Sequence, residues 1–248
     1  MQLERTEQQD LSTSHRTVLV VAQTPPPMHG QAIMTKLFLD AVHQRVSIAF
    51  VRMAFSGTIV EVGRLRLQKL AELATLLVKI FWEKFRTKAE ILYYPPASPN
   101  LVPFFRDVFV LGLTRWMFKK TVFHFQAVGI GEMYTRLPRC LRPLFRIAYF
   151  NPDLAICLTH ATSVDAGHMI PRRTVVIPNA AVDRNCGHNA RAPGTSGQSV
   201  PQILFVGMFC EEKGVLDLIS ACQKLDSLNT PYRLAFAGAP QSHEFALE

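Results

Sequence analysis

A lysine and a glycine stand directly before an apolar helical pattern near the carboxyl end of the chain. The segment EEKG occupies residues 211–214, and VLDLI follows it. The first turn of a helix presents unpaired backbone amides, and a lysine beside it adds a point charge. Lys213 and Gly214 are therefore suited to binding a diphosphate, although a charged turn in solvent is the more common meaning of such residues.

A second candidate for phosphate binding lies near the amino end. The run VLVVA at residues 18–22 is apolar without alternation, which is typical of a strand covered on both faces. Three prolines at residues 25–27 end it, and His29 and Gly30 lead into an amphipathic helix pattern. Amides at the start of that helix can point at phosphates, and Gly30 permits close approach of the backbone. A plain turn into a core helix, with His29 in solvent, is equally consistent with these residues.

Histidine and glutamine occur at the end of another apolar strand. The segment TVFHFQ, residues 121–126, contains His124 and Gln126. Glutamine can hydrogen-bond a hydroxyl group but cannot exchange a proton at neutral pH. His124 is either a group that meets a ligand or a hydrogen-bonded histidine of the core.

These segments belong to an alternation of strand and helix patterns that runs along the chain. Strands separated by helices indicate βαβ crossovers and therefore a mostly parallel sheet. The predicted fold class is α/β, doubly wound. The predicted strands are residues 18–22, 46–51, 90–94, 121–125, 153–158, 174–178, 202–207 and 233–238.

Two of the helical patterns make specific predictions. Ser98 is expected to be the N-cap of a helix whose first residue is Pro99. Its apolar run, residues 101–118, contains Arg106, Asp107 and Arg115, so we expect a core helix rather than a membrane span. The other pattern predicts a buried helical face made of Leu70, Leu73, Ala74, Leu77 and Phe81.

The composition changes at residues 183–201, which are rich in Gly, Ser, Asn and Pro and have no apolar period. We expect a linker there, between a first domain at residues 17–182 and a second that starts at residue 202. Residues 1–16 are polar and predict a disordered lead-in, not a signal peptide. Residues 202–248 hold two strands and one helix, so we expect a truncated domain, or one completed in trans, with a protease-labile tail.

The charge predicts an anionic partner. The formal net charge is +8 and the sequence pI is about 9.5. Anionic lipid and phosphate-bearing ligands fit this sign, whereas nothing resembles a nucleic-acid-binding motif. Peripheral contact with an anionic membrane and a solvated basic face are the two interpretations. The basic residues are Arg64, Arg66, Lys69, Lys79, Lys84, Arg86 and Lys88 around the long helix, and the arginines of RLPRCLRPLFR (136–146).

Metal and disulfide chemistry find no support in the sequence. The five cysteines contain no CxxC pair, and their spacing suggests neither a zinc site nor a disulfide framework. Reduced thiols in the core of a cytosolic protein are expected. No carboxylate cluster suited to Mg²⁺ is evident, so we expect no metal and no cofactor.

Five segments resemble the family 4 glycosyltransferases, which have the two-domain GT-B fold. They occur in the family's order and span nearly the whole chain. The resemblance implies two Rossmann-like, doubly wound domains, the second incomplete here, with the first facing the acceptor and the second binding the donor. The segments are VLVVAQTPPPMHGQ (18–31), LYYPPASPN with PFFRD (92–107), TVFHFQAVGIGE (121–132), VVIPNAAVD (175–183) and ILFVGMFCEEKGVLDLI (203–219).

The resemblance also implies an activity and roles for residues. The protein would transfer a sugar, with retention, from a nucleotide-diphosphate sugar to a saccharide or lipid-linked acceptor. Gly30, Lys213 and Gly214 would bind the donor phosphates. His124 and Gln126 would be the catalytic positions near the transferred sugar, with Gln126 where relatives usually have histidine.

The remaining implied roles concern the acceptor side and the hinge. His29 and Asn179 are placed there, in segments that lead into the cleft and the interdomain connection. The implied setting is polysaccharide or glycolipid assembly in the cytoplasm, at the inner face of the cytoplasmic membrane.

Two other functions are compatible with the same residues. Gln126 and the end of the chain before the family's paired-glutamate motif favour a non-catalytic remnant that acts only as a binding module. A GT-B-fold epimerase is the other possibility, although its carboxylate and histidine catalytic groups are not found here.

Overall fold

The computed structural model describes residues 16–26, 30–53, 64–180, 200–207 and 209–238. The chain divides into two compact units, Met1–Val182 and Asp183–Glu248. The elements of the first are β1 (Val18–Ala22), α1 (Gly30–Val42), β2 (Ile48–Arg52), α2 (Arg64–Thr87), β3 (Ile91–Tyr94), α3 (Leu101–Thr114), η1 (Arg115–Met117), β4 (Lys120–Phe125), α4 (Ile130–Arg136), α5 (Arg142–Tyr149), β5 (Leu154–Cys157), α6 (His160–Gly167) and β6 (Thr174–Val176).

A six-stranded parallel sheet organises the first unit, which confirms the predicted α/β class. Its strand order is β2-β1-β3-β4-β5-β6, and every neighbouring pair is parallel. The strand β1 pairs with β2 on one side and β3 on the other, so Val18 stands beside both Ile48 and Ile91. Its continuous apolar run is explained by this central place, because four of its five residues are buried.

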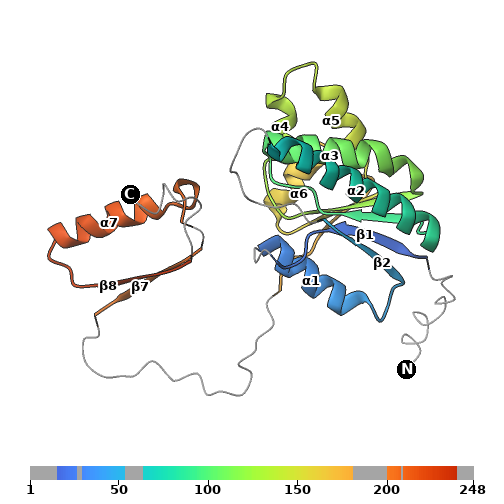
Figure 1. Ribbon diagram of the computed structural model, residues 1–248. Helices are drawn as coiled ribbons and strands as arrows, with labels where there is room; N and C mark the ends of the chain where they lie inside the picture. Colours follow the sequence, from blue (N-terminus) through green and yellow to red (C-terminus); the bar gives the residue numbers. More distant parts are fainter. Residues whose placement is uncertain (1–15, 27–29, 54–63, 181–199, 208, 239–248) are drawn as a thin grey trace, which may run out of the picture. The chain divides into compact units, whose positions relative to one another are not determined.

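Helices cover the two faces of this sheet unequally (Figure 1). The helices α2, α3 and α5 lie on one side, where Ile80, Leu111 and Phe145 pack with the inward side chains of the strands. On the other side α1 packs over a smaller cluster of Val20, Ala22 and Tyr93. The side chains that β4 directs to the α1 face are therefore less buried than those it directs to the α2–α3–α5 face.

Three local predictions are corrected by the structure. The helix α3 begins at Leu101 with Asn100 as its N-cap, so Ser98 is not the cap. Among residues 70–87 of α2, Leu76 and Ile80 are buried, whereas Leu70 is 60% exposed. The buried face of α2 is displaced because the helix continues to Thr87 and packs on β2 and α3 through its later turns. The expected core helix at residues 101–118 is buried on one face only.

Three of the four described cysteines agree with the prediction of reduced thiols in the core. Cys157, Cys210 and Cys222 are buried and free. Cys140 is also free but exposed, because it lies between α4 and α5 rather than on a strand or a helix face. Cys186 lies outside the described residues.

The second unit contains β7 (Gln202–Val206), η2 (Glu211–Lys213), α7 (Val215–Ser227) and β8 (Arg233–Ala237). The strands β7 and β8 form a parallel pair, with Gln202 opposite Arg233. A backbone hydrogen bond links the chain at the carboxyl ends of the two strands: the Gly207 amide donates to the Ala237 carbonyl. Gly238 is required here, because a Cβ on it would lie 1.7 Å from the Gly207 carbonyl oxygen.

Candidate functional site

The direction of strand addition reverses at β1, which defines the candidate site of the first unit. After β2 is added on one side of β1, every later strand is added on the other side, beginning with β3. In open parallel sheets, ligands bind beyond the carboxyl ends of the strands at such a reversal. The loops that follow these strand ends are the β1–α1 loop and the loop after β3.

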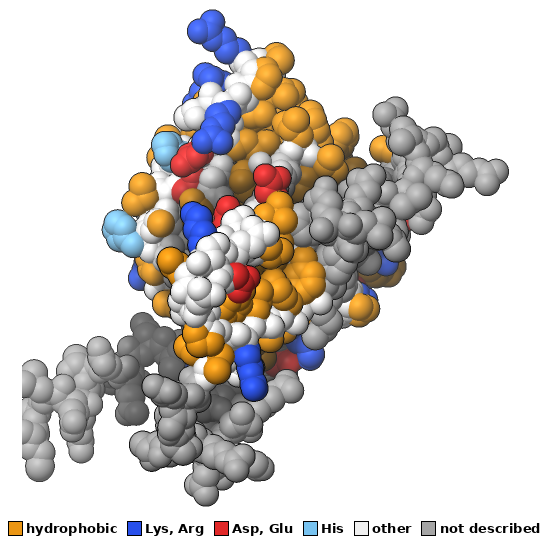
Figure 2. Space-filling view, turned by 90° about the vertical axis from the view of Figure 1, so that its left-hand side faces the viewer, with side chains coloured by type: hydrophobic (Ala, Val, Ile, Leu, Met, Phe, Trp, Pro, Cys, Tyr) orange, Lys and Arg blue, Asp and Glu red, His pale blue; other side chains and the backbone are white. Residues whose placement is uncertain are grey.

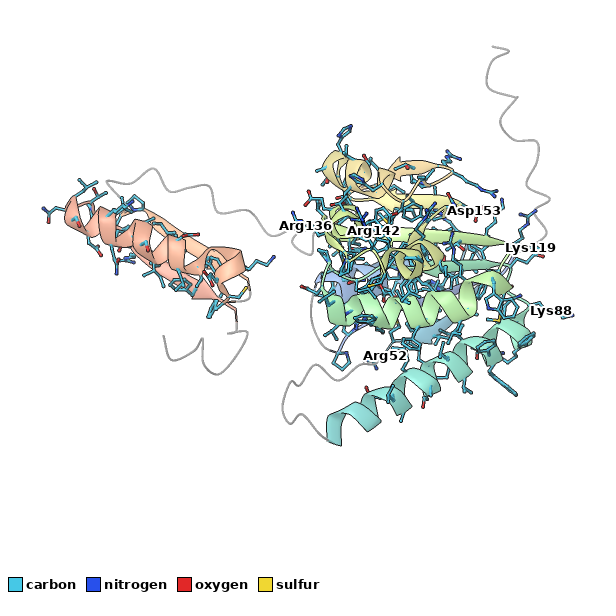
Figure 3. The ribbon with its side chains drawn as sticks, turned by 90° about the horizontal axis from the view of Figure 1, so that it is seen from above. Arg52, Lys88, Lys119, Arg136, Arg142 and Asp153 are labelled. Atoms are coloured by element: carbon cyan, nitrogen blue, oxygen red, sulfur yellow. The ribbon has the colours of Figure 1, made fainter. Side chains whose placement is uncertain are left out.

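Two side chains hold these loops in place. Arg52, the last residue of β2, donates to the carbonyl oxygens of Thr24 and Pro26. Gln31, in the first turn of α1, approaches the Pro95 carbonyl at 3.5 Å. Arg52 is exposed and appears in Figure 3. The edge of the sheet therefore carries a cation whose position is fixed by backbone oxygens.

A polar cluster occupies the α1 face of β3 and β4 close to this edge. The Tyr93 hydroxyl lies 2.5 Å from His124 Nδ1. The Gln126 side-chain nitrogen lies 3.4 Å from His124 Nε2 and 3.5 Å from its Nδ1. The ring of Phe38, from α1, stacks on Tyr93 at a centroid distance of 4.8 Å. The structure thus brings His124 and Gln126 together and adds Tyr93 to them.

His124 is electrically neutral at physiological pH. Burial lowers its pKa to about 4. A neutral imidazole has one donor and one acceptor nitrogen. If Nδ1–H donates to the Tyr93 oxygen, Nε2 accepts from the Gln126 amide, and both contacts are satisfied. In this form the cluster can orient hydroxyl groups but cannot supply a positive charge.

Asp107 is a buried carboxylate that fixes the loop after β3. It is fully buried, and it accepts from the hydroxyls of Tyr94 at 2.6 Å and Tyr149 at 3.1 Å. Its other donors are the Ala97 amide at 3.0 Å and the guanidinium of Arg106 at 2.7 Å. Burial and the Asp107 charge raise the pKa of both tyrosines, so they remain donors. Asp107 therefore connects α3 and α5 to the carboxyl end of β3.

Asp165 is a second buried carboxylate, and it fixes the loop after β4. Its carboxylate accepts from the amides of Gly129 at 3.0 Å and Glu132 at 3.1 Å. These contacts cap α4, whose N-cap Gly129 has a φ of 100°. Gly131 must be glycine, because a Cβ there would lie 2.2 Å from the Asp165 carbonyl oxygen. The amides at the start of α4 are thus committed to a side chain of the protein.

A pocket of about 620 Å³ opens beside these two loops. Residues after β3 and residues after β4 contribute to its wall. An ion pair lies within it, since Arg136 contacts Glu132 at 2.9 Å. The lining residues are Pro99, Asn100, Leu101, Val102, Gly129, Glu132, Met133, Arg136, Leu137 and Pro138.

In the second unit, the predicted phosphate residues lie at the start of α7. Gly214 is the N-cap of this helix and has a φ of 72°, a conformation that favours glycine. Lys213 is exposed and forms no salt bridge with the residues that the structure describes. Asp217, in the first turn, is the acidic residue nearest to Gly214. An anion bound here would meet Lys213 and free amides, but also the carboxylate of Asp217.

The other predicted residues have less definite surroundings. Gly30 begins α1 and is exposed, and a Cβ added to it would meet nothing within 4 Å. Asn179 is exposed in the segment after β6. His29 lies outside the described residues. In the described part of the chain, no three His, Cys, Asp or Glu side chains gather as a metal site would require.

Four residues of the site were missed in the sequence. Tyr93 and Arg52 occur at strand ends, where a polar group after an apolar run is a usable signal. Asp107 is the single acid of an apolar helix, which indicates a buried, hydrogen-bonded carboxylate, whereas Asp165 lies in a short helix of mixed composition that gives no such signal. Their partners could not be read from the sequence, because they come from other elements.

Comparison with known proteins gives low similarity. No protein-family model matches the sequence, and no curated protein matches it. A crystal structure of the glycotransferase of kitacinnamycin aligns over 90% of this chain and 66% of its own, with 9% identity and a TM-score of 0.43. Acinetobacter baumannii MurG aligns over 94% of this chain and 70% of its own, with 11% identity and a TM-score of 0.36. The chain thus spans just under two thirds of the first of these proteins, and likeness at this level identifies no family.

Proposed function

We propose that the chain belongs to a GT-B glycosyltransferase of the family 4 type, with the first unit on the acceptor side and the second unit binding the donor. The reaction is transfer of a sugar, with retention, from a nucleotide-diphosphate sugar to a saccharide or lipid-linked acceptor. The observation that carries the proposal is the cluster of Tyr93, His124 and Gln126 near the strand reversal of the first unit. Three neutral hydrogen-bonding side chains there suit the hydroxyl groups of a sugar.

The neutral state of His124 is consistent with this chemistry. Retaining transfer in this fold requires mainly orientation of the sugar and stabilisation of the leaving diphosphate, not a protein group that exchanges protons. In our proposal the cluster orients the sugar, and Lys213 with the amides after Gly214 stabilises the diphosphate. The pocket containing Glu132 and Arg136 offers a carboxylate and a guanidinium to acceptor hydroxyls. No metal ion is needed in this scheme.

The donor site is tested by nucleotide binding. Melting temperatures would be measured with uridine and guanosine diphosphates and their sugars, and affinities by calorimetry. Lys213→Ala is expected to weaken binding about 10- to 100-fold, since a charge-assisted hydrogen bond contributes about 1.5–3 kcal/mol. Lys224→Ala removes another exposed lysine of the same unit, in the last turn of α7, and should leave the affinity unchanged. A folded chain that none of these nucleotides stabilises would contradict the proposed donor site.

A binding module without transferase activity is the second candidate, and Gln126 favours it, because it stands at a position where the family usually has histidine. Release of nucleoside diphosphate from the sugar donor that binds distinguishes the two. Binding without release, in the presence of saccharide and lipid-linked acceptors, would identify the module. Release that His124→Ala abolishes, while donor affinity is retained, would identify the transferase.

A further inference from the structure

The outward side of α3 is apolar along its whole length. Every exposed residue of α3 and η1 is hydrophobic, with exposed fractions from 41% to 77%. A helix on the surface of a globular protein normally carries polar residues there. We call this set the α3 face; its members are Leu101, Val102, Phe105, Phe109, Leu113 and Trp116.

Neighbouring helices extend the apolar surface. Exposed Ile147 of α5 lines the same pocket as Trp116, and α5 packs along α3. On α2, which also contacts α3, Val78, Trp82 and Phe85 are at least 66% exposed. Figure 2 shows another side of the molecule, where exposed hydrophobic side chains also lie beside Lys and Arg side chains. A surface of this extent marks an interaction site rather than scattered apolar residues.

Arginines stand at both ends of the α3 face. Leu101 and Val102 share a pocket with Arg136, which is paired with Glu132. Trp116 shares a second pocket, of about 430 Å³, with Arg115, Arg146 and Asp153. Arg115 donates to three backbone carbonyls, whereas Arg146 is exposed and lies over the Phe150 ring at 5.3 Å.

Most exposed charges around this surface are positive, although Glu132, paired with Arg136, is an exposed acid at its border. Within residues 70–120 and 141–150, all of them described, no aspartate or glutamate is exposed. Glu83 and Glu90 are paired with Arg86 and Lys119, and Asp107 is buried. Figure 3 shows Lys88 and Lys119 at one end of the helical layer and Arg136 and Arg142 at the other. The exposed cations in these ranges are Lys79, Arg86, Lys88, Lys119, Lys120 and Arg146.

We infer that the α3 face binds the surface of an anionic lipid bilayer. Aromatic and aliphatic side chains flanked by lysine and arginine match the boundary between acyl chains and anionic headgroups. Pairing with a second copy fits less well. A two-fold interface would place the same largely cationic borders of both copies against each other. None of the described helices is long and apolar enough to cross a membrane, so the contact is peripheral.

The two tryptophans of the chain make this inference directly measurable. Trp82 and Trp116 are 69% and 74% exposed, and both belong to this surface. Their emission should shift to shorter wavelength when phosphatidylglycerol-containing vesicles are added, and brominated acyl chains should quench it. Vesicles of phosphatidylcholine alone should give a much weaker response, and salt should weaken binding to the anionic ones. Co-sedimentation with the vesicles provides an independent measure.

A double substitution and a matched control locate the contact. Phe105→Ser/Phe109→Ser should weaken partition into anionic vesicles by at least about tenfold, because two phenyl rings no longer enter the bilayer. Val164→Ser/Ile170→Ser removes two other exposed apolar side chains, which are 60% and 61% exposed, and should leave the partition into vesicles unchanged. Circular dichroism would verify that both variants are folded, and lipid quenching of the unaltered protein needs no variant.

Two results would overturn the inference. One is a folded protein whose emission and sedimentation are unaffected by anionic vesicles at low salt. The other is a dimer in sedimentation equilibrium whose tryptophan emission changes with protein concentration, which would show that a second copy covers the face. Neither result depends on nucleotide binding, so these experiments test the inference independently of the proposed function.

Discussion

His124 should make the stability of the first unit depend on pH in a predictable direction. Burial places its folded-state pKa at about 4, against an ordinary value of 6.5. Between these values the unfolded chain binds a proton that the folded chain does not, so stability falls as the pH is lowered through this window. Each pKa unit corresponds to about 1.4 kcal/mol, and the ring is partly exposed, so the expected loss is about 2–3 kcal/mol.

Substitution by asparagine isolates this contribution. His124→Asn keeps a polar group beside Tyr93 but cannot titrate. At about pH 7 the variant should be less stable than the original chain by about 1 kcal/mol, because ring packing and one hydrogen bond are weakened. At about pH 4 the order should reverse, since only the original chain has lost the histidine contribution.

Urea unfolding followed by circular dichroism at several pH values measures the difference between the two proteins. Other titrating groups contribute equally to both and cancel from this difference. A difference that stays constant from about pH 7 to about pH 4 would refute the reasoning, and His124 would then be solvated rather than buried beside Tyr93. NMR titration of the imidazole checks the same pKa directly.

Three further predictions concern the residues that shape the site. Asp107→Asn should reduce the free energy of unfolding by about 3–5 kcal/mol in urea denaturation, because it breaks a buried ion pair, whereas Asp40→Asn, in an exposed pair, should change it by less than about 1 kcal/mol. Gly131→Ala should lower the melting temperature, because its Cβ meets the Asp165 backbone; an unchanged melting temperature would contradict the close contact. Gly30→Ala should leave the melting temperature unchanged, and a loss of nucleotide affinity in this variant would show that a ligand approaches the backbone there.

Local pattern was sufficient to predict the elements of the sheet. The bounds of β1 and the start of α1 agree with prediction, because prolines and a glycine separate the two elements. The neighbours of each strand were not predicted, since an apolar run shows that a strand is buried but not what lies beside it. The buried face of α2 was misjudged for the same reason: many of its residues are apolar, and packing on β2 and α3 decides which of them are covered.

The site was predictable only in the parts that lie on one strand. His124 and Gln126 are two residues apart, so an extended backbone alone directs both to one face. Tyr93 joins them because the β3–β4 register sets Tyr93 beside Val122, one pleat from His124. Register depends on tertiary packing, so this third member could not be found from spacing. The exposed α3 face was missed because an apolar helix with two charges has the composition of a core helix.

The strand order also bears on how the protein is made. Once β1 and β2 have paired, β3 joins β1, and β4, β5 and β6 each join the strand that preceded them. The strands β3 to β6 thus all add on the same side of this sheet, in the order in which they leave the ribosome. No strand has to insert between two that are already paired. The sheet can therefore grow during synthesis, and the edge exposed at each stage is covered by the next strand to emerge.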